Sequence, residues 1–301
     1  MNRYEEVMER KGFIGGSDAP IILGLSPWKS PYQLWREKVG LDDPEDISGL
    51  DHVHFGVVLE DIVAQEWARR HSRKVRRMNK RAVHQKYDFI CAQIDRRIVG
   101  GGILECKTTG ARNSDDWLSG PPAHYWVQVQ HQLMTTGIDD AAIAVLIGGQ
   151  KYADFDIEAD KKFQEDLLDL ELDFWDKVQR GVPPDPISTE EAKRVWQKYT
   201  PLEVYASEND IKNIKTLVEV RAKIEEVEKQ EEAAKLALMS ALKDIGDTLI
   251  VNNVPVVSWK SQQRTSIDTK VLKEKYPDIA KELTVVSESR TFRVLKGADK
   301  I

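Results

Sequence analysis

Residues 87–149 alternate strand-like and helix-like segments, and this order restricts the possible folds more than any other feature. The runs "YDFICAQID" and "GILECKTT" are rich in apolar residues and are joined by the glycine-rich "RRIVGGG", as in a hairpin. A polar loop, the helix-like "AHYWVQVQHQLMTTG" and the buried-type strand "AAIAVLIGG" follow. The pattern predicts a compact α/β domain.

Helices are expected on both sides of this segment. "HFGVVLEDIVAQEWARRH" (54–71) and residues 159–180 have apolar residues at helical spacing. The proline-rich "GVPPDP" then predicts a boundary between a core, residues 1–186, and an extension, residues 187–301. Within the extension we expect one long helix with a single apolar stripe (207–245), followed by a small β-hairpin in "DTLIVNNVPVVSWK".

Composition indicates a globular protein, because 41% of the 301 residues are hydrophobic and 31% are charged. No apolar run approaches the roughly 20 residues that span a bilayer, and the charged amino terminus does not look like a secretory signal. The two cysteines, Cys91 and Cys106, fit a reducing compartment and are too few for a four-cysteine metal site. We therefore expect a cytoplasmic protein without a membrane partner.

The charge is unevenly distributed. The net charge is −6, and residues 1–150 hold 19 Lys/Arg against 20 Asp/Glu, whereas residues 151–301 hold 25 against 30. Within the first half, residues 69–86 contain nine Lys/Arg and no acid. Such a run is typical either of a solvated helix end or of a surface that binds a nucleic-acid backbone.

Glu105 and Lys107 lie two residues apart in the second predicted strand, so their side chains share one face of the sheet. Asp95 ends the preceding run, and a hairpin would bring it close to both. Two carboxylates that bind Mg²⁺ and an amine that orients or deprotonates water are the groups that hydrolyse phosphodiesters. Charged hairpins often show the same spacing, so an ordinary ion pair remains an alternative.

Polar residues elsewhere allow similar alternatives. Tyr125, Gln128 and His131 are three residues apart and would share one helical face, which either lines a site or faces solvent. Glu60 would lie on the helix of residues 54–71, where a solvated glutamate is equally ordinary. In "RKGFIGGS" (10–17), paired glycines permit tight turns and the serine could cap a helix beside aromatic packing.

Four segments, taken in order, resemble one family: "GGSDAPIILGLSPWKSPYQLWREKVG", "FGVVLEDIVAQEW", "AQIDRRIVGGGILECKTT" and "PPAHYWVQVQHQLMTTG". They are similar to the signature blocks of the phage-type YqaJ recombinase nucleases, which include the lambda-type exonucleases of the PD-(D/E)XK superfamily. The resemblance covers about residues 10–180. It implies a restriction-endonuclease-like α/β core with a central mixed β-sheet flanked by helices, to which the long helix and small β extension are added.

Site residues follow from this resemblance position by position. It implies that Asp95, Glu105 and Lys107 form the catalytic triad and that Gln128 is a further catalytic residue lining the active site. It also implies further site residues: Glu60 and the Cys106 carbonyl beside the metal, Tyr125 along the active site, and Arg10 and Ser17 at a 5′-terminal phosphate. Cys106 departs from the apolar residue that lambda-type enzymes carry there, but only its carbonyl would bind metal.

The resemblance implies a Mg²⁺-dependent exonuclease, with Mn²⁺ able to substitute, that degrades double-stranded DNA ends 5′→3′ for phage recombination. It also implies a homotrimeric ring, a single-strand annealing protein as partner, and the host-cell cytoplasm as location. A structure- or sequence-specific endonuclease and a non-catalytic DNA-end binding protein are the alternatives. A helicase–nuclease is disfavoured, because the chain contains no G-x(4)-G-K-[ST] motif.

Overall fold

The structure is a computed structural model of the 301-residue chain, and it describes residues 8–47, 49–199, 201–263, 265–285, 290–295 and 297–298. Contacts between Cα atoms divide the chain into two units, Met1–Val195 and Trp196–Ile301. Each unit is described by itself. Among the described residues, no helix combines the length and the apolar character that crossing a membrane requires.

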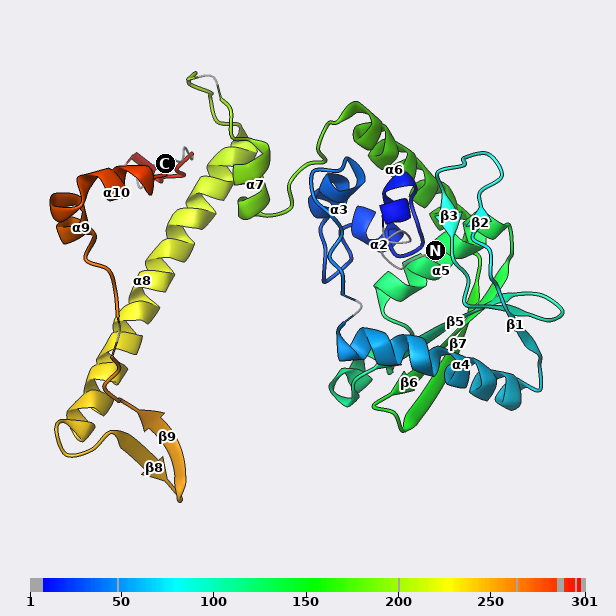
Figure 1. Cartoon of the computed structure of the whole chain (residues 1–301), viewed down its shortest axis with the longest axis horizontal. Helices are drawn as coiled ribbons and strands as arrows, with labels where there is room; N and C mark the ends of the chain where they lie inside the picture. The colour runs from blue at the N-terminus through cyan, green and yellow to red at the C-terminus, as the bar shows by residue number, and fades with distance from the viewer. Residues whose placement is uncertain are drawn as a thin grey trace. The chain divides into compact units, whose positions relative to one another are not determined.

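The first unit is built on a five-stranded sheet with the order β1-β4-β5-β6-β7 (Figure 1). Only the β5–β6 pair is parallel, so the sheet is mixed. Its strands are β1 (Val75–Arg77), β4 (Arg96–Ile98), β5 (Ile103–Thr109), β6 (Asp140–Ile147) and β7 (Lys151–Glu158). The predicted mixed α/β core is confirmed.

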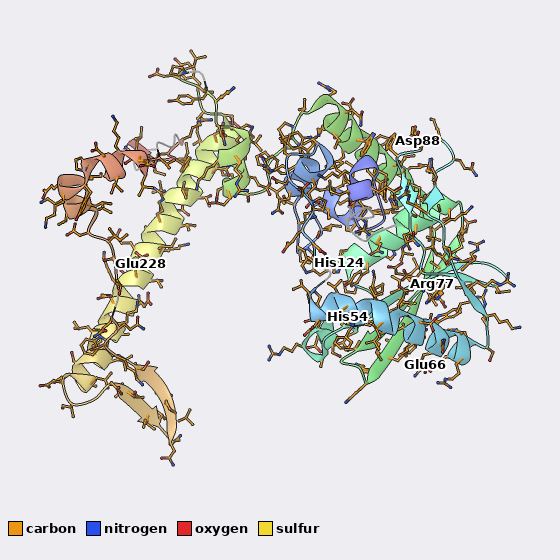
Figure 2. All side chains as sticks on the ribbon, viewed as in Figure 1. His54, Glu66, Arg77, Asp88, His124 and Glu228 are labelled. Atoms are coloured by element: carbon orange, nitrogen blue, oxygen red, sulfur yellow. The ribbon has the colours of Figure 1, made fainter. Side chains whose placement is uncertain are left out.

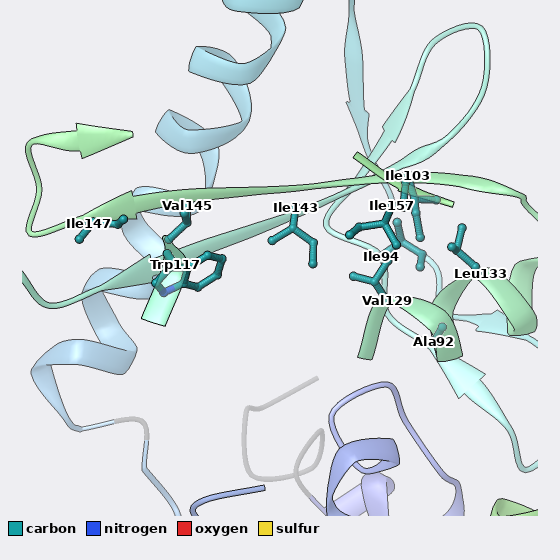
Figure 3. Packing of buried hydrophobic residues seen from close by; sticks show 11 residues of the cluster. Ala92, Ile94, Ile103, Trp117, Val129, Leu133, Ile143, Val145, Ile147 and Ile157 are labelled. Carbon is teal, nitrogen blue, oxygen red and sulfur yellow. The ribbon is translucent and has the colours of Figure 1, made fainter. Parts of the chain in front are cut away.

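Two helices cover opposite faces of this sheet. Alternate residues of β5 and β6 pack with Val129 and Leu133 of α5 (Ala123–Thr136), and Figure 3 shows this cluster gathered on one side of the sheet. The other residues of the same strands, including Leu104, pack against Val63 and Trp67 of α4 (Asp51–His71). A strand with both faces covered is apolar along most of its length, which explains why "AAIAVLI" has no polar alternation.

The hairpin that leads into β5 differs from the prediction. Arg96–Ile98, which we expected in the connection, form the strand β4 that pairs with β5, whereas Cys91–Ala92 form the short strand β3 and pair with β2 (Ala82–Val83). Gly100, Gly101 and Gly102 all have positive φ, between 90° and 128°. Three consecutive glycines can reverse the chain within a few residues, so Arg96 and Arg97 remain available to pair with β5.

The remaining helices of the first unit pack around the amino-terminal segment, except η2 (Ala111–Trp117), which packs against β6. The others are η1 (Arg10–Gly12), α2 (Ala19–Ile22), α3 (Pro31–Lys38), α6 (Lys161–Arg180) and α7 (Thr189–Val195). Tyr32, Leu34 and Trp35 of α3 form a second core with Phe174 and Val178 of α6. This core fixes the chain before α2 beside α5.

The second unit contains the expected long helix and hairpin. The helix α8 (Glu208–Leu242) begins with a capping box in which Ser207 and Asp210 exchange hydrogen bonds. The hairpin of β8 (Thr248–Val251) and β9 (Val254–Ser258) turns at Asn252 and Asn253, both with positive φ. Two short helices follow, α9 (Thr269–Lys275) and α10 (Pro277–Glu282). The later run "RTFRVL" (290–295), whose apolar residues could have added a strand, forms none.

Candidate active site

Strand β5 presents Glu105 and Lys107 to the face that α5 covers. Ile103, on the same side of the strand, belongs to the core under α5, while Leu104 and Cys106 pack toward α4. The Glu105 side chain is only 4% exposed and that of Lys107 is 19% exposed. The alternation of the strand therefore places an acid and an amine together in a largely dehydrated position.

Asp95 lies beside this pair, immediately before β4. Its Oδ2 atom accepts a hydrogen bond of 2.9 Å from the main-chain N–H of Cys106. Extending the β4–β5 register by one residue places Asp95 opposite Glu105. Burial, reinforced by the negative charge of Glu105, raises the pKa of Asp95 to about 8.

The Glu105 carboxylate is surrounded by donors. Its Oε1 atom lies 2.6 Å from Lys107 Nζ and accepts a 2.6 Å hydrogen bond from Gln128 Nε2, and its Oε2 accepts a 2.7 Å bond from Gln132 Nε2. Lys107 Nζ also donates to Gln128 Oε1 at 3.1 Å. Gln128 thus contacts both strand residues and fixes their separation.

Tyr125 lies one turn before Gln128 on α5, and Lys107 Nζ is 4.7 Å from the centre of its ring. An aromatic face attracts a nearby cation. Burial opposes the charged form of Lys107, but Glu105 and then Asp95 outweigh it and raise the pKa of the amine. Lys107 is therefore an ammonium whose three protons all point to acceptors or into the site.

Gln132 and His131 change the expected polar face of α5. His131 points away from the site and is fully buried, with Nδ1 2.7 Å from Glu171 Oε1 and Nε2 2.9 Å from the Cys91 carbonyl. Gln132 occupies the place in the site that was predicted for His131. Its Nε2 also donates a hydrogen bond to the Gln93 carbonyl at 3.1 Å. The sequence did contain this signal, because Gln132 follows Gln128 by four residues, the helical repeat.

Glu60 lies on α4, across the sheet from the Glu105 side chain. Its Oε1 atom lies 2.5 Å from Nη1 of the buried Arg96, and Nη2 of the same guanidinium contacts Asp61 at 3.1 Å. Glu60 is close enough for its charge to add to the raised pKa of Asp95. The structure thus brings Glu60 near the site but pairs its carboxylate with an arginine.

Cys106 contributes its main chain to the site and its side chain to the α4 core. The N–H of Cys106 faces Asp95, and the N–H and C=O of one strand residue point to the same side. The Cys106 carbonyl therefore also faces Asp95.

A pocket of about 330 Å³ joins these groups to the amino-terminal segment. Asp95, Glu105 and Lys107 line it together with Arg10 and Ser17, and its other lining residues include Gln93, Gln128, Gln132 and Arg81. Ser17 is exposed and does not cap α2, whose N-cap residue is Asp18. Residues separated by some 90 positions in the sequence therefore share one pocket.

The donor set in this pocket fits a hard divalent cation. Asp95 and Glu105 are both buried, and burial together with the charge of Glu105 raises the pKa of Asp95. A bound cation would offset the cost of holding two buried negative charges close together. In the described part of the chain, no three His, Cys, Asp or Glu side chains are grouped as a complete metal site. Mg²⁺ needs no such cage, because it is commonly bound by one or two carboxylates, water and substrate phosphate.

A mixed sheet between helices, with two acids and a lysine beside its parallel pair, defines a restriction-endonuclease-like α/β protein of the PD-(D/E)XK type. Residues 7–139 match the YqaJ-like viral recombinase domain. The chain is 36% identical to uncharacterized protein YqaJ of Bacillus subtilis (strain 168) over 304 residues, which cover 98% of this chain and 94% of that protein. The chain therefore belongs to the YqaJ-like viral recombinase family, as its sequence blocks predicted.

Solved structures resemble more than half of the chain. The alkaline exonuclease LHK-Exo from Laribacter hongkongensis has a TM-score of 0.50 and 14% identity, covering 59% of this chain and 93% of that one. A phage related exonuclease from Haemophilus somnus 129PT has a TM-score of 0.43 and 13% identity, covering 56% and 96%. The likeness to LHK-Exo concerns the fold of the core.

Proposed function

We propose that this protein is a Mg²⁺-dependent deoxyribonuclease that degrades double-stranded DNA from its ends, 5′→3′, and leaves 3′ single strands for phage recombination. The observation that carries the proposal is the convergence of Asp95, Glu105, Lys107, Arg10 and Ser17 in one pocket. The first three suit phosphodiester hydrolysis, and the last two suit recognition of a terminal phosphate. A pocket of about 330 Å³ also matches the size of a nucleotide-sized ligand.

Asp95, Glu105 and the Cys106 carbonyl would hold the metal ion, with Mn²⁺ as a substitute for Mg²⁺. When bound, the ion would supply Lewis-acid polarisation of the scissile phosphate and a water of lowered pKa. Glu60 would act from the other face of the sheet through its charge, with Arg96 limiting its access.

Lys107 would orient the attacking water and stabilise negative charge on the phosphate. Two of its protons are directed at Glu105 and Gln128, which leaves the third for a ligand in the pocket. Gln128 and Gln132 would keep the carboxylate and the amine in place through the reaction, because both are already hydrogen-bonded to Glu105. Tyr125 would restrict Lys107 from the side of α5.

Arg10 and Ser17 would bind the 5′-terminal phosphate. A terminal phosphate carries more negative charge than an internal diester, and a guanidinium can contact it with two parallel hydrogen bonds. An enzyme with this contact cuts from an end rather than within a strand. The contact therefore distinguishes the exonuclease from an endonuclease with the same catalytic groups.

Incubation with linear and closed circular duplex DNA in Mg²⁺ tests the proposal. We expect loss of the linear form alone, label released from the 5′ end first, similar activity in Mn²⁺, and none with a chelator. 5′-Phosphorylated ends should be degraded about tenfold faster than 5′-hydroxyl ends, since a charge-assisted hydrogen bond contributes roughly 1.5–3 kcal/mol. Nicking of the circle would indicate an endonuclease, and binding without cleavage a DNA-end binding protein.

Arg10→Ala should remove most of the preference for phosphorylated ends and leave cleavage of hydroxyl ends intact. Lys11→Ala is a matched control, because it removes one positive charge from the adjacent residue, whose Nζ pairs with Asp43 at 2.8 Å. If both variants keep the preference, Arg10 does not bind the terminal phosphate.

The assembly and setting proposed for this activity come from the family resemblance. They are a homotrimeric ring around DNA, a single-strand annealing protein as partner, and the cytoplasm of a host cell. Sedimentation with and without DNA would test the trimer, and co-purification with the annealing protein would test the partner.

A further inference from the structure

The edge of the sheet at β1 carries positive charges that have no acidic partner. We call Lys74, Arg76, Arg77, Lys80 and Arg97 the basic edge; Figure 2 labels Arg77 on this strand. Within the described residues, none of the five forms an ion pair. Several neighbouring arginines do: Arg69 and Arg70 contact Glu66, Arg81 contacts Glu9, and Arg96 contacts Glu60 and Asp61. Arg73 instead donates a hydrogen bond to the Gly101 carbonyl.

The register makes the basic edge unfavourable without a ligand. Arg76 lies directly opposite Arg97 across the β1–β4 pair, and like charges in that position destabilise a sheet. Arg97 Nη1 is buried and has no hydrogen-bond partner among the described residues. An unsatisfied buried donor on a cation is costly, and an anion at this position would satisfy it.

Arg76 and Arg97 also lie on the face of the sheet that carries the active site. Arg97 is paired with Ile103, which shares its side of β5 with Glu105 and Lys107. Arg96, one residue earlier, points to the opposite face and is neutralised there. The unpaired arginine thus shares a face with the catalytic groups.

The basic edge continues into the active-site pocket. Lys80 is followed by Arg81, which lines that pocket. Gln93, another lining residue, donates a 3.3 Å hydrogen bond to the Met78 carbonyl. The chain therefore passes from the pocket wall to β1 within a few residues. The opposite edge strand, β7, instead carries the acidic residues Asp154, Asp156 and Glu158.

We propose that the basic edge binds the phosphodiester backbone of the DNA whose end occupies the active-site pocket. This inference rests on the proposed function and adds the surface along which the substrate lies. Regularly spaced phosphates complement a row of unpaired lysines and arginines, and the acidic β7 edge would repel them. The backbone belongs either to the duplex ahead of the cut or to the single strand left behind.

Salt dependence of DNA binding tests the basic edge. Binding is measured in Ca²⁺, with blunt duplex and with single-stranded DNA, for the wild type and for Lys74→Gln/Arg76→Gln, two residues that share the active-site face of the sheet by strand alternation. Each phosphate contact contributes about 0.9 to the slope of log K against log salt for duplex and about 0.7 for single strands, so the variant's slope should fall by about 1.8 or 1.4. The DNA form that shows the decrease identifies the bound strand.

Lys161→Gln/Lys162→Gln is the matched control. It also removes two exposed positive charges, but these pair with Asp139 and Asp166 on another surface. We expect its slope to equal that of the wild type. An equal decrease in both variants, or no decrease in Lys74→Gln/Arg76→Gln, would overturn the proposal. If the strand substitutions impair folding, Lys74→Gln/Lys80→Gln, outside β1, makes the same comparison.

The assay separates this inference from the nuclease proposal because it requires no cleavage. If the wild type degrades DNA but the variant binds DNA with the same salt slope as the wild type, the proposed role of the basic edge is refuted and the nuclease proposal is not. A wild type that cuts nothing but shows a steeper slope than the variant refutes the nuclease and supports the basic edge.

Discussion

Lys38 holds the segment that carries Arg10 and Ser17, so its removal tests how the part of the pocket proposed to bind DNA ends is built. Its side chain is 3% exposed. The three protons of Nζ are donated to the Arg10 carbonyl at 2.6 Å, the Phe13 carbonyl at 2.5 Å and Asp18 Oδ2 at 2.7 Å. Lys38→Met keeps the volume of the side chain and removes all three contacts.

The expected loss follows from burial. Asp18 would keep only its 3.0 Å hydrogen bond from the Gly15 N–H, and an unpaired buried charge costs about 3–5 kcal/mol of unfolding free energy. Burial opposes the ionised form of Asp18, but Lys38 outweighs it and lowers the pKa. The pKa of an aspartate in the unfolded chain is about 3.9, and a carboxyl whose pKa is lower in the folded protein stabilises the fold above that pH. This stabilisation is lost as the pH falls through the folded-state pKa. The deficit of Lys38→Met should therefore be fully present from pH 7 to about pH 4 and shrink as the pH falls further.

Denaturant unfolding followed by tryptophan fluorescence measures the loss. Lys29→Met is the control, because Lys29 forms a more exposed ion pair with Glu37 and should cost at most about 1 kcal/mol. Lys38→Met/Asp18→Leu should recover part of the loss. Equal costs for Lys38→Met and Lys29→Met, together with an undiminished preference for phosphorylated ends, would refute the positioning of Arg10 by Lys38.

Three further predictions concern catalysis, the core and the second unit. Lys107→Met should lower the rate of linear DNA degradation by about 10²–10³ in a protein that circular dichroism shows to be folded, and full activity would contradict its role. Burial opposes a charged His131, but the Glu171 carboxylate outweighs burial and raises the pKa of His131. The unfolding free energy of the wild type should therefore fall as pH rises above about 6.5, and His131→Gln should lack this pH dependence. A chain ending at Val195 should remain folded and show detectable hydrolysis, as measured by circular dichroism and nuclease assay; complete unfolding would show that the first unit depends on the second.

Local periodicity was enough to predict the strand and the helix that face each other in the site. Glu105 and Lys107 share a face because strand side chains alternate, and Gln128 meets them because the apolar stripe of α5 fixes how that helix packs. The sequence blocks then placed Arg10 and Ser17 in the same site. Their presence in one pocket with Glu105 is a geometric finding that no local pattern contains.

Long-range pairings were beyond prediction from a single sequence. Glu171 faces His131 and Lys38 faces Asp18 across 40 and 20 residues, and neither pairing leaves a periodic signal. The α5 helix was assigned one polar face, yet a shift of one residue separates Gln132 in the site from His131 in the core, which is about 100° on a helix. Strand β4 was missed because a short run beside three glycines resembles a turn.

The distribution of charge explains how a chain of net charge −6 can bind DNA. Its acidic excess is mainly in residues 151–301, whereas the cations of the basic edge and of Arg10 are in the first 100 residues. At physiological ionic strength charges more than about 8 Å apart are largely screened, so a phosphate at β1 experiences the arginines around it rather than the net charge. At low salt the screening length exceeds 30 Å near 0.01 M, and the distant acids begin to repel DNA as well. The steep gain in affinity that lower salt gives to a basic protein should therefore flatten here towards about 0.01 M, while the difference between wild type and Lys74→Gln/Arg76→Gln persists.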